Sequence, residues 1–385
     1  MIRNVKLALA AVAAVVMIQA PAIAADNQAV AAAIDQAVQK AIAEGVSPGL
    51  QVAVYKDGSP LLVKGYGSAD LEMSVPVTND SVFRIGSVTK QFTAVALLQL
   101  QEAGKLSIDD TLSKYYPNYP RGGDITIRQM LNHTSGLYNY TSQEDYMKAD
   151  AMVHRSTEEY VDYFSKMKKT QDFEPGTSWM YSNTAYYILG AIVEKVEGKP
   201  LGAVFQERFF GPLGMTRTAI DDENDIVAGR VEGYAADGPG KFKNATFISM
   251  TAPGGGGAMR STASDLARWN AALFGGKLLK PASFAAMTAP GKLKDGQNSG
   301  IAIAKLAGMG MPAVEYGFGL MTQTVDGHAK VAHGGGINGF NAQLAEYPKD
   351  RLTVAVLSNT IGKDVGAGKV ADEIERIALG LPPKP

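Results

Sequence analysis

Strand-like segments lie at both ends of this chain, whereas the strongest periodic segments between them are helical. Near the N-terminus, two hydrophobic runs at residues 50–55 and 61–64 flank Asp57-Gly58, a dipeptide that favours a hairpin turn. Near the other end, four further strands are expected at residues 320–325, 329–333, 340–347 and 352–357. Because strands need partners, the economical arrangement is one antiparallel sheet assembled from both termini.

Helices are expected around and between these strands. Residues 29–43 and 370–379 have apolar residues at helical spacing and are expected to cover the sheet. Other helices are expected at residues 91–102, 156–169 and 184–196, and an exposed loop at 289–311. We therefore predict an α+β fold: an antiparallel sheet flanked by helices (residues 25–85 plus 253–385) with an inserted helical domain (residues 86–252).

Residues 1–24 have the features of a secretory signal peptide. Arg3 and Lys6 form a basic start, an apolar run follows at residues 7–18, and small residues precede a cleavage site near Ala24. A membrane anchor is the alternative, but the run is shorter than the ~20 residues that span a bilayer. The chain has no cysteine, which excludes a lipid-anchored signal and a disulfide framework. We predict a periplasmic or secreted protein with no membrane span after cleavage.

Charge and histidine spacing exclude several classes of partner. The formal net charge of -1 becomes -3 after cleavage, because residues 1–24 carry two basic and no acidic side chains. Neither value suggests nucleic acid or an anionic membrane as a partner. The four histidines, His133, His154, His328 and His333, show no metal-ligand spacing. We expect no metal and no other cofactor, and the sequence does not define an oligomeric state.

Ser87 and Lys90 form the first candidate catalytic pair. They are three residues apart at the start of the helix expected at residues 91–102, so their side chains share one face. A serine here can also be a simple helix cap, and on its own that reading is favoured. The chain holds a second Ser-x-x-Lys, Ser165 with Lys168, which we interpret as a solvated helix face.

Two later segments add to the candidate site. Tyr181 and Asn183 precede an apolar helix, where Asn183 could merely cap the helix and Tyr181 could merely pack. His333 is followed by Gly334, Gly335 and Gly336, which could form a plain glycine turn after a strand. Each simple reading wins when a segment is taken alone. Their order and chain context together favour a serine acyl-transfer site.

Two rival sites are dismissed on local context. Residues 45–49 match Gly-x-Ser-x-Gly, but that elbow runs from strand to helix, whereas Ser47 lies between a helix and a strand. Pro48 also lacks the N–H that the residue after such a serine must donate. His133 could suggest a Ser-His-Asp triad, but its loop context suits a stabilising hydrogen bond better.

With these motifs in hand, the chain resembles the serine β-lactamase and penicillin-binding protein superfamily. Within it, the chain is most similar to the branch of class C β-lactamases, D-alanyl-D-alanine carboxypeptidases, D-aminopeptidases and related esterases. The resemblance rests on three motifs at residues 83–90, 181–183 and 333–340. Supporting stretches lie at residues 104–110, 131–137, 211–215 and 261–267. It implies a β-lactamase/transpeptidase-like fold.

The residues and the resemblance together suggest a role for each site residue. A serine hydroxyl needs a base, and Lys90 can serve once burial lowers its pKa; Tyr181 can then relay the proton. The resemblance implies that the backbone N–H groups of Ser87 and Gly336 bind the oxyanion. Asn183 is expected to hold the substrate amide, and the absence of side chains at Gly334, Gly335 and Gly336 is expected to let the substrate lie close to the strand.

One departure from the family pattern bears on substrate choice. Where the β-lactamases of the family have Lys-Thr-Gly, this chain has His333-Gly334-Gly335, a form that is similar to the one in some peptidase and esterase relatives. A histidine offers no fixed charge to a carboxylate, so it is expected to orient Tyr181 or the far end of the substrate.

We therefore expect a secreted serine hydrolase that forms an acyl-enzyme on Ser87. Its substrate is expected to be a D-amino-acid or cell-wall peptide, as for a D-alanyl-D-alanine carboxypeptidase. Two alternatives remain open. One is a carboxylic-ester hydrolase or weak β-lactamase on the same site, and the other is a β-lactam-binding or sensing module without turnover.

Overall fold

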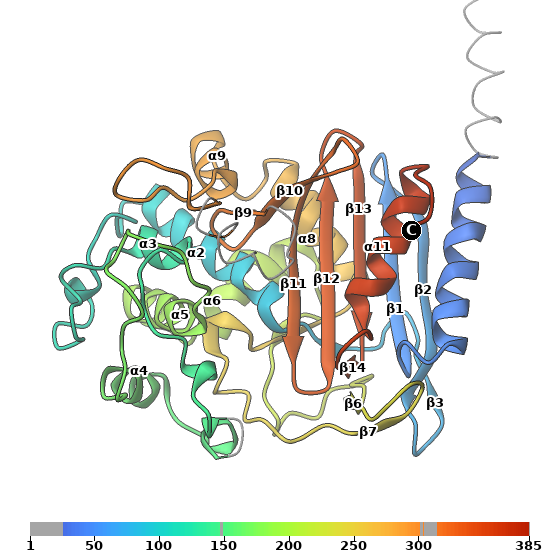
Figure 1. Cartoon of the computed structure of the whole chain (residues 1–385), viewed down its shortest axis with the longest axis horizontal. Helices are drawn as coiled ribbons and strands as arrows, with labels where there is room; N and C mark the ends of the chain where they lie inside the picture. The colour runs from blue at the N-terminus through green and yellow to red at the C-terminus, as the bar shows by residue number, and fades with distance from the viewer. Residues whose placement is uncertain (1–25, 147–148, 301–302, 304–313, 385) are drawn as a thin grey trace, which may run out of the picture.

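The computed structural model describes residues 26–146, 149–300, 303 and 314–384. Its main feature is an eight-stranded sheet in which all neighbouring strands are antiparallel (Figure 1). In spatial order the strands are β3 (Val75–Pro76), β2 (Ser59–Asp70), β1 (Gly49–Lys56), β13 (Leu352–Ser358), β12 (Phe340–Tyr347), β11 (His328–Ile337), β10 (Met321–Val325) and β9 (Glu315–Tyr316).

The pairing of β1 with β13 joins the two ends of the chain at the centre of the sheet. Leu50 lies opposite Ser358, and Val54 lies opposite Val354. The hairpin between β1 and β2 turns at Asp57-Gly58, where both residues have positive φ. The predicted α+β fold with one sheet assembled from both termini is therefore confirmed.

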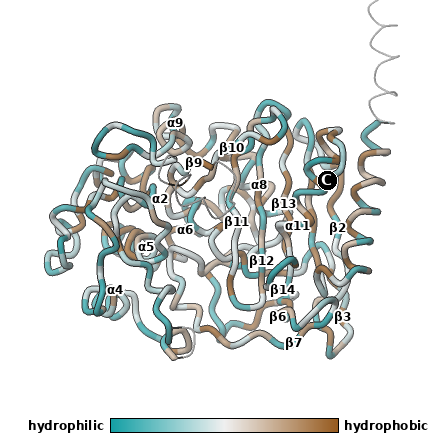
Figure 2. The backbone as a smooth tube through the Cα atoms, viewed as in Figure 1, coloured by the Kyte–Doolittle hydropathy of each residue, from teal (hydrophilic) through white to brown (hydrophobic). Residues whose placement is uncertain are grey.

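One face of the sheet is covered by a helix at residues 26–43 and by α11 (Ala367–Ala378) (Figure 1). Val38 and Ile374 from these helices pack with Val52 and Val354 of the sheet, and all four are buried. In Figure 2, brown residues alternate with teal and pale ones along the N-terminal helix, as expected when only one side is buried. Both helices were predicted from their spacing.

The other face packs against the remaining helices in one large hydrophobic cluster. Ala53 and Ala355 point to this side because successive residues of a strand face opposite ways. Phe92 stacks on Trp269 with ring centroids 3.7 Å apart, which ties two of the helices together. The helices of this layer are α2 (Thr89–Glu102), α3 (Ile127–Leu131), α4 (Thr157–Ser165), α5 (Asn183–Glu197), α6 (Leu201–Phe205), α7 (Gly211–Leu213), α8 (Ala263–Phe274) and α9 (Pro281–Thr288).

Short strands link the helical layer to the rest of the molecule. They form two three-stranded sheets: β4 (Phe83–Arg84), β8 (Met259–Ser261) and β5 (Ala219–Ile220) in one, and β14 (Thr360–Ile361), β6 (Tyr234–Ala236) and β7 (Phe242–Asn244) in the other. The hydrophobic cluster that holds the helices also includes sheet residues such as Leu357. The division into a sheet domain and an inserted helical domain stays a prediction.

Several boundaries differ from those predicted from the sequence. The helix expected at residues 156–169 ends at Ser165. The strand expected at residues 329–333 continues through the glycines to Ile337, because its ladder with β12 extends to Phe340. The expected signal peptide and much of the loop at 289–311 lie outside the described residues. Within the described part of the chain, no helix combines the length and apolar character needed to cross a bilayer.

Candidate active site

Ser87 lies in a 3-10 turn, η1 (Gly86–Val88), which leads directly into α2. Its side chain caps neither element, because no side-chain hydrogen bond caps the start of η1 or of α2. Gly86 has φ +49, and a Cβ on it would come within 2.9 Å of the backbone of Gly336. The glycine therefore allows the serine turn to lie directly against β11, and the capping alternative for Ser87 is excluded.

Lys90 lies one turn further along the helix, and its amine is surrounded by three oxygen atoms. Its Nζ lies 3.1 Å from Ser87 Oγ, 2.8 Å from Asn183 Oδ1 and 2.7 Å from the carbonyl oxygen of Gly256. The last two oxygens can only accept hydrogen bonds. A neutral amine has two N–H donors, which these two acceptors occupy. Its lone pair is then left for the hydroxyl proton of Ser87.

Burial favours this neutral amine. The Lys90 side chain is 0 % exposed, and its Nζ lies 4.8 Å from the ring centroid of Tyr181 and 5.4 Å from that of Tyr186. Loss of water around the ammonium form holds the pKa of Lys90 well below its ordinary value of 10.5. The position of Lys90 next to Ser87 and its lowered pKa both agree with the role of base that was predicted for it.

The carbonyl of Gly256 was not predicted from the sequence. It belongs to a 3-10 turn, η7 (Gly254–Gly256), that packs on α5. A Cβ on Gly190 of that helix would meet Gly255 Cα at 2.9 Å, so the two backbones touch. The glycine run at residues 254–257 was the available signal, since glycines permit such close backbone approach.

Tyr181 and Asn183 flank the start of α5. Ser182, and not Asn183, caps this helix, because its side chain accepts a hydrogen bond from the Ala185 N–H. The Asn183 amide is instead shared between Lys90 and Thr141, whose Oγ1 accepts at 3.2 Å. Burial raises the pKa of Tyr181, and a hydrogen bond with Ser87 opposes that shift. Tyr181 is therefore a neutral phenol beside the serine.

His333 is buried, and both of its ring nitrogens are occupied. Nδ1 lies 2.6 Å from the carbonyl of Gly334, which can only accept, so Nδ1 carries the proton. Nε2 then accepts from the hydroxyl of Tyr316 at 2.9 Å. Burial lowers the pKa of His333 to about 3, and the bond with the Gly334 carbonyl opposes that shift. The imidazole is therefore neutral, and both of its nitrogens are bound to protein groups. A hydrogen bond from His333 to the substrate, as predicted, would require one of these two bonds to break.

Beyond Ala332, the edge of β11 that lies next to Ser87 has no strand paired to it among the described residues. Its neighbour β10 begins at Met321, which lies opposite Ala332, so the pairing with β10 does not reach residues 333–337. A Cβ on Gly335 would lie 1.9 Å from the Ile85 carbonyl, which shows that this glycine serves the contact with the serine turn. Gly336 is exposed instead, and a Cβ on it would make an ordinary contact, 3.5 Å from Ile361 Cδ1. The expected benefit to substrate approach therefore applies to Gly336 more than to Gly335.

The rival candidates have structural roles. Ser47 is buried, and its Oγ lies 2.7 Å from both Ser358 Oγ and the Gly49 carbonyl. Ser165 donates a hydrogen bond to the Asp162 carbonyl on the surface. No hydrogen bond joins it to a lysine among the described residues, in contrast to Ser87. His133 is buried among aromatic rings and accepts from the Ser182 N–H at 3.2 Å, as expected for a residue that stabilises a loop.

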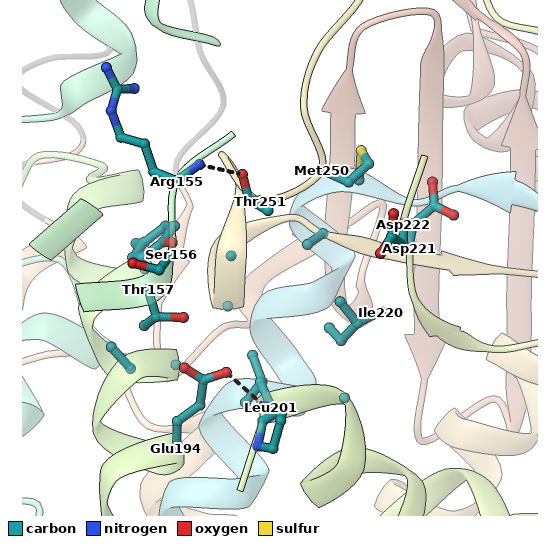
Figure 3. A pocket seen from close by; sticks show the side chains of 18 of the residues that line it. Arg155, Ser156, Thr157, Glu194, Leu201, Ile220, Asp221, Asp222, Met250 and Thr251 are labelled. Carbon is teal, nitrogen blue, oxygen red and sulfur yellow. Dashed lines mark hydrogen bonds between the residues drawn. The ribbon is translucent and has the colours of Figure 1, made fainter. Parts of the chain in front are cut away.

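Two pockets lie on either side of this arrangement. One is lined by Ser87, Tyr181 and His333 together with residues of β10, β11 and β12. Figure 3 shows the other, in which Thr157, Glu194 and Asp221 come from separate elements around the cavity. Gly254 and Gly255 of η7 also line this second pocket, and none of the predicted catalytic residues does.

The fold and the chemistry of the serine, lysine and tyrosine define the class of protein, a serine hydrolase. The Beta-lactamase family model matches residues 34–378, and the chain belongs to this family. It is 27% identical to penicillin-binding protein 4* of Bacillus subtilis over 86% of this chain and 72% of that one. It is 28% identical to the D-aminopeptidase of Brucella anthropi, over 87% of this chain and 60% of the relative.

A solved structure shows the same architecture. The D-stereospecific amidohydrolase from a Streptomyces species superposes with a TM-score of 0.75 at 28% identity, covering 89% of this chain and 98% of that one. The β-lactamase/transpeptidase-like fold and the family predicted from the three motifs are confirmed.

Proposed function

We propose that the protein hydrolyses amide bonds of D-amino-acid or cell-wall peptides through an acyl-enzyme on Ser87. One observation carries this proposal: the buried amine of Lys90 has two obligate acceptors, Asn183 Oδ1 and the Gly256 carbonyl, and Ser87 Oγ on its third side. Such a lysine can take the serine proton without first losing one of its own. Serine is a weak nucleophile without such a base.

Acylation would proceed as follows. The Ser87 proton moves to the lone pair of Lys90 while Oγ bonds to the substrate carbonyl carbon. When the tetrahedral intermediate collapses, the C–N bond breaks and the leaving nitrogen receives that proton through the phenol of Tyr181. In deacylation, water attacks the ester, its proton passes to Lys90, and Ser87 leaves with a proton restored to its oxygen.

The developing oxyanion needs two fixed donors. The backbone N–H groups of Ser87 and Gly336 are proposed for this role. Their two segments are in contact, since a Cβ on Gly86 would lie 2.9 Å from Gly336 N. Loss of one such donor typically costs ~3 to 4 kcal/mol of transition-state stabilisation.

The proposed substrate class rests on the relatives of the chain. The relatives are described as a penicillin-binding protein, a D-aminopeptidase and a D-stereospecific amidohydrolase. An amide bond next to a D-residue is the chemistry common to the last two. Because the chain covers only 60% of the D-aminopeptidase, its full substrate range is not carried over.

Carboxylic-ester hydrolysis is the second candidate, and the neutrality of His333 favours it. A histidine with its pKa at about 3 gives a substrate carboxylate no positive partner at neutral pH. The same feature disfavours efficient turnover of β-lactams, which carry a carboxylate. A panel of D- and L-alanine amides, D-alanyl-D-alanine, a short-chain aryl ester and a penicillin tests the order. Faster turnover of the L-amides than of the D-amides would contradict the proposal.

Secretion remains part of the proposal, because residues 1–24 are outside the described chain. The basic start and apolar run support export to the periplasm or medium. The mass of the protein recovered from the periplasmic fraction tests it. A mature chain that begins near Ala25 is expected, and a full-length chain retained in the cytoplasm would contradict it.

A further inference from the structure

Two glutamine side chains line the pocket of Ser87. Gln343 lies on β12 opposite Gly334, and Gln323 lies on β10, so the two flank β11 from either side. A Cβ on Gly334 would lie 2.9 Å from Gln343 Oε1. The missing side chain of Gly334 therefore leaves room for the carboxamide of Gln343, which lines the same pocket as Ser87.

The carboxamides of Gln323 and Gln343 are partly buried, and within the described residues neither side chain has a hydrogen-bond partner. A carboxamide has two N–H donors and one carbonyl acceptor, and because neither glutamine is fully buried, these groups stay open to a ligand. A ligand that offers both a donor and an acceptor would satisfy them.

The pocket that the two glutamines share with Ser87 has no charged residue in its described lining. Gln323 also borders a neighbouring pocket that Asp326, Asp372, Glu375 and Arg376 line. The other described residues that line this pocket are Ser87, Tyr181, Met321, Ala332, His333 and Gly334. Lys330 lies opposite Gln323 in the strand register, but its amine is buried in an ion pair with Glu375 at 2.6 Å. Its charge is therefore matched within the fold and is not directed to this pocket.

We propose that Gln343, with Gln323, forms a carboxamide subsite that binds an amide group of the substrate beyond the scissile bond. An amide can donate to a glutamine oxygen and accept from a glutamine N–H, whereas an ester only accepts and a carboxylate brings an unmatched charge. The subsite thus selects substrates with an amide at this point over esters and free acids. This inference rests on the proposed function of Ser87.

The test uses three substrates with the same scissile bond. D-alanyl-D-alanine carries a C-terminal amide, methyl ester or free carboxylate, and kcat/KM is measured for wild type and for Gln343→Met, which keeps the side-chain length but removes the hydrogen bonds. Wild type is expected to prefer the amide. The variant is expected to lose about tenfold on the amide and less than about threefold on the ester, as for one or two lost neutral hydrogen bonds.

Controls separate this inference from the proposed function. Thr324→Ala changes an exposed residue of β10 outside the serine pocket and should leave all three rates unchanged. Acylation of Ser87 by a small aryl ester, which lacks the distal group, reports whether the nucleophile works at all. Equal losses on amide and ester in Gln343→Met, or a wild-type preference for the carboxylate, would overturn the subsite while leaving Ser87 in its role.

Discussion

The amine of Lys90 lies 2.7 Å from the carbonyl oxygen of Gly256, a residue far away in the chain. This contact has a chemical consequence, because a carbonyl cannot donate and so occupies one N–H of the amine permanently. With Asn183 occupying the second, only the lone pair is left for Ser87. In the proposed mechanism, these two acceptors therefore set the direction of proton transfer.

A substitution that disturbs the contact between Gly190 and Gly255 should lower the catalytic rate. Gly190→Ala places a Cβ 2.9 Å from Gly255 Cα, so the turn must shift and carry the Gly256 carbonyl with it. We expect kcat to fall at least about tenfold with little change in KM, because a misplaced base affects the transition state more than binding. The matched control is Gly202→Ala in α6, where the nearest contact of a Cβ is an ordinary 3.5 Å; it should retain wild-type rates.

A charge at position 183 should move the pH profile. Asn183→Asp places a carboxylate beside the Lys90 amine, which favours the ammonium form and raises the pKa of Lys90. Since the ammonium form cannot accept the serine proton, the acid limb of kcat/KM should shift to higher pH by one unit or more. A pH–rate profile of the two proteins measures this. An unchanged limb would mean that Lys90 is not the titrating base.

Buried neutral histidines should make the protein sensitive to acid. The pKa of His333 is about 3 in the fold, and burial holds the pKa of His133 well below its ordinary 6.5 as well. Between pH 6.5 and 3 the unfolded chain binds protons that the folded chain does not. Stability should therefore be fully present above pH 6.5 and fall steadily as the pH drops towards 3.

Urea unfolding at several pH values checks this acid sensitivity. In His333→Gln, the free energy of unfolding should decrease less steeply as the pH falls. In His154→Gln, at an exposed position, its dependence on pH should be the same as in wild type. A wild-type free energy of unfolding that stays constant from pH 7 to pH 4 would contradict the account.

The dismissed elbow serine provides a separate prediction. Ser47→Ala removes a buried hydroxyl that bonds to Ser358, and leaves that second hydroxyl short of a partner. We expect the free energy of unfolding to fall by about 1 to 3 kcal/mol while kcat per folded molecule stays near wild type. Chemical denaturation and a rate normalised to folded protein measure the two quantities. Loss of activity in a fully folded variant would point to a catalytic serine at this position.

Local sequence patterns predicted the parts of this fold that depend on side-chain periodicity. The Asp57-Gly58 hairpin, the helix at residues 26–43 and α11 all follow from the spacing of apolar residues and turn formers. The same reasoning ended a strand at His333, because glycines have low strand propensity. In the structure, the ladder with β12 overrides that propensity through to Ile337.

Within the site, the sequence was sufficient to predict the residues whose side chains carry the chemistry, but it did not predict the backbone groups. Ser87, Lys90 and Tyr181 have side chains with recognisable spacing, and the structure brings them together. The Gly256 carbonyl leaves no residue-type signature, because every residue has one. The bond between Tyr316 and His333 depends on tertiary packing of two strands and was likewise missed.

The most direct measurement is intact-protein and peptide mass spectrometry after a short exposure to an activated D-amino-acid ester or a penicillin. Wild type should carry one acyl adduct, located on Ser87, and Ser165→Ala should behave identically, since that surface serine has no buried lysine beside it. Ser87→Ala should show neither adduct nor turnover. An adduct on another residue, or full hydrolytic activity in Ser87→Ala, would contradict the assignment of Ser87 as the nucleophile.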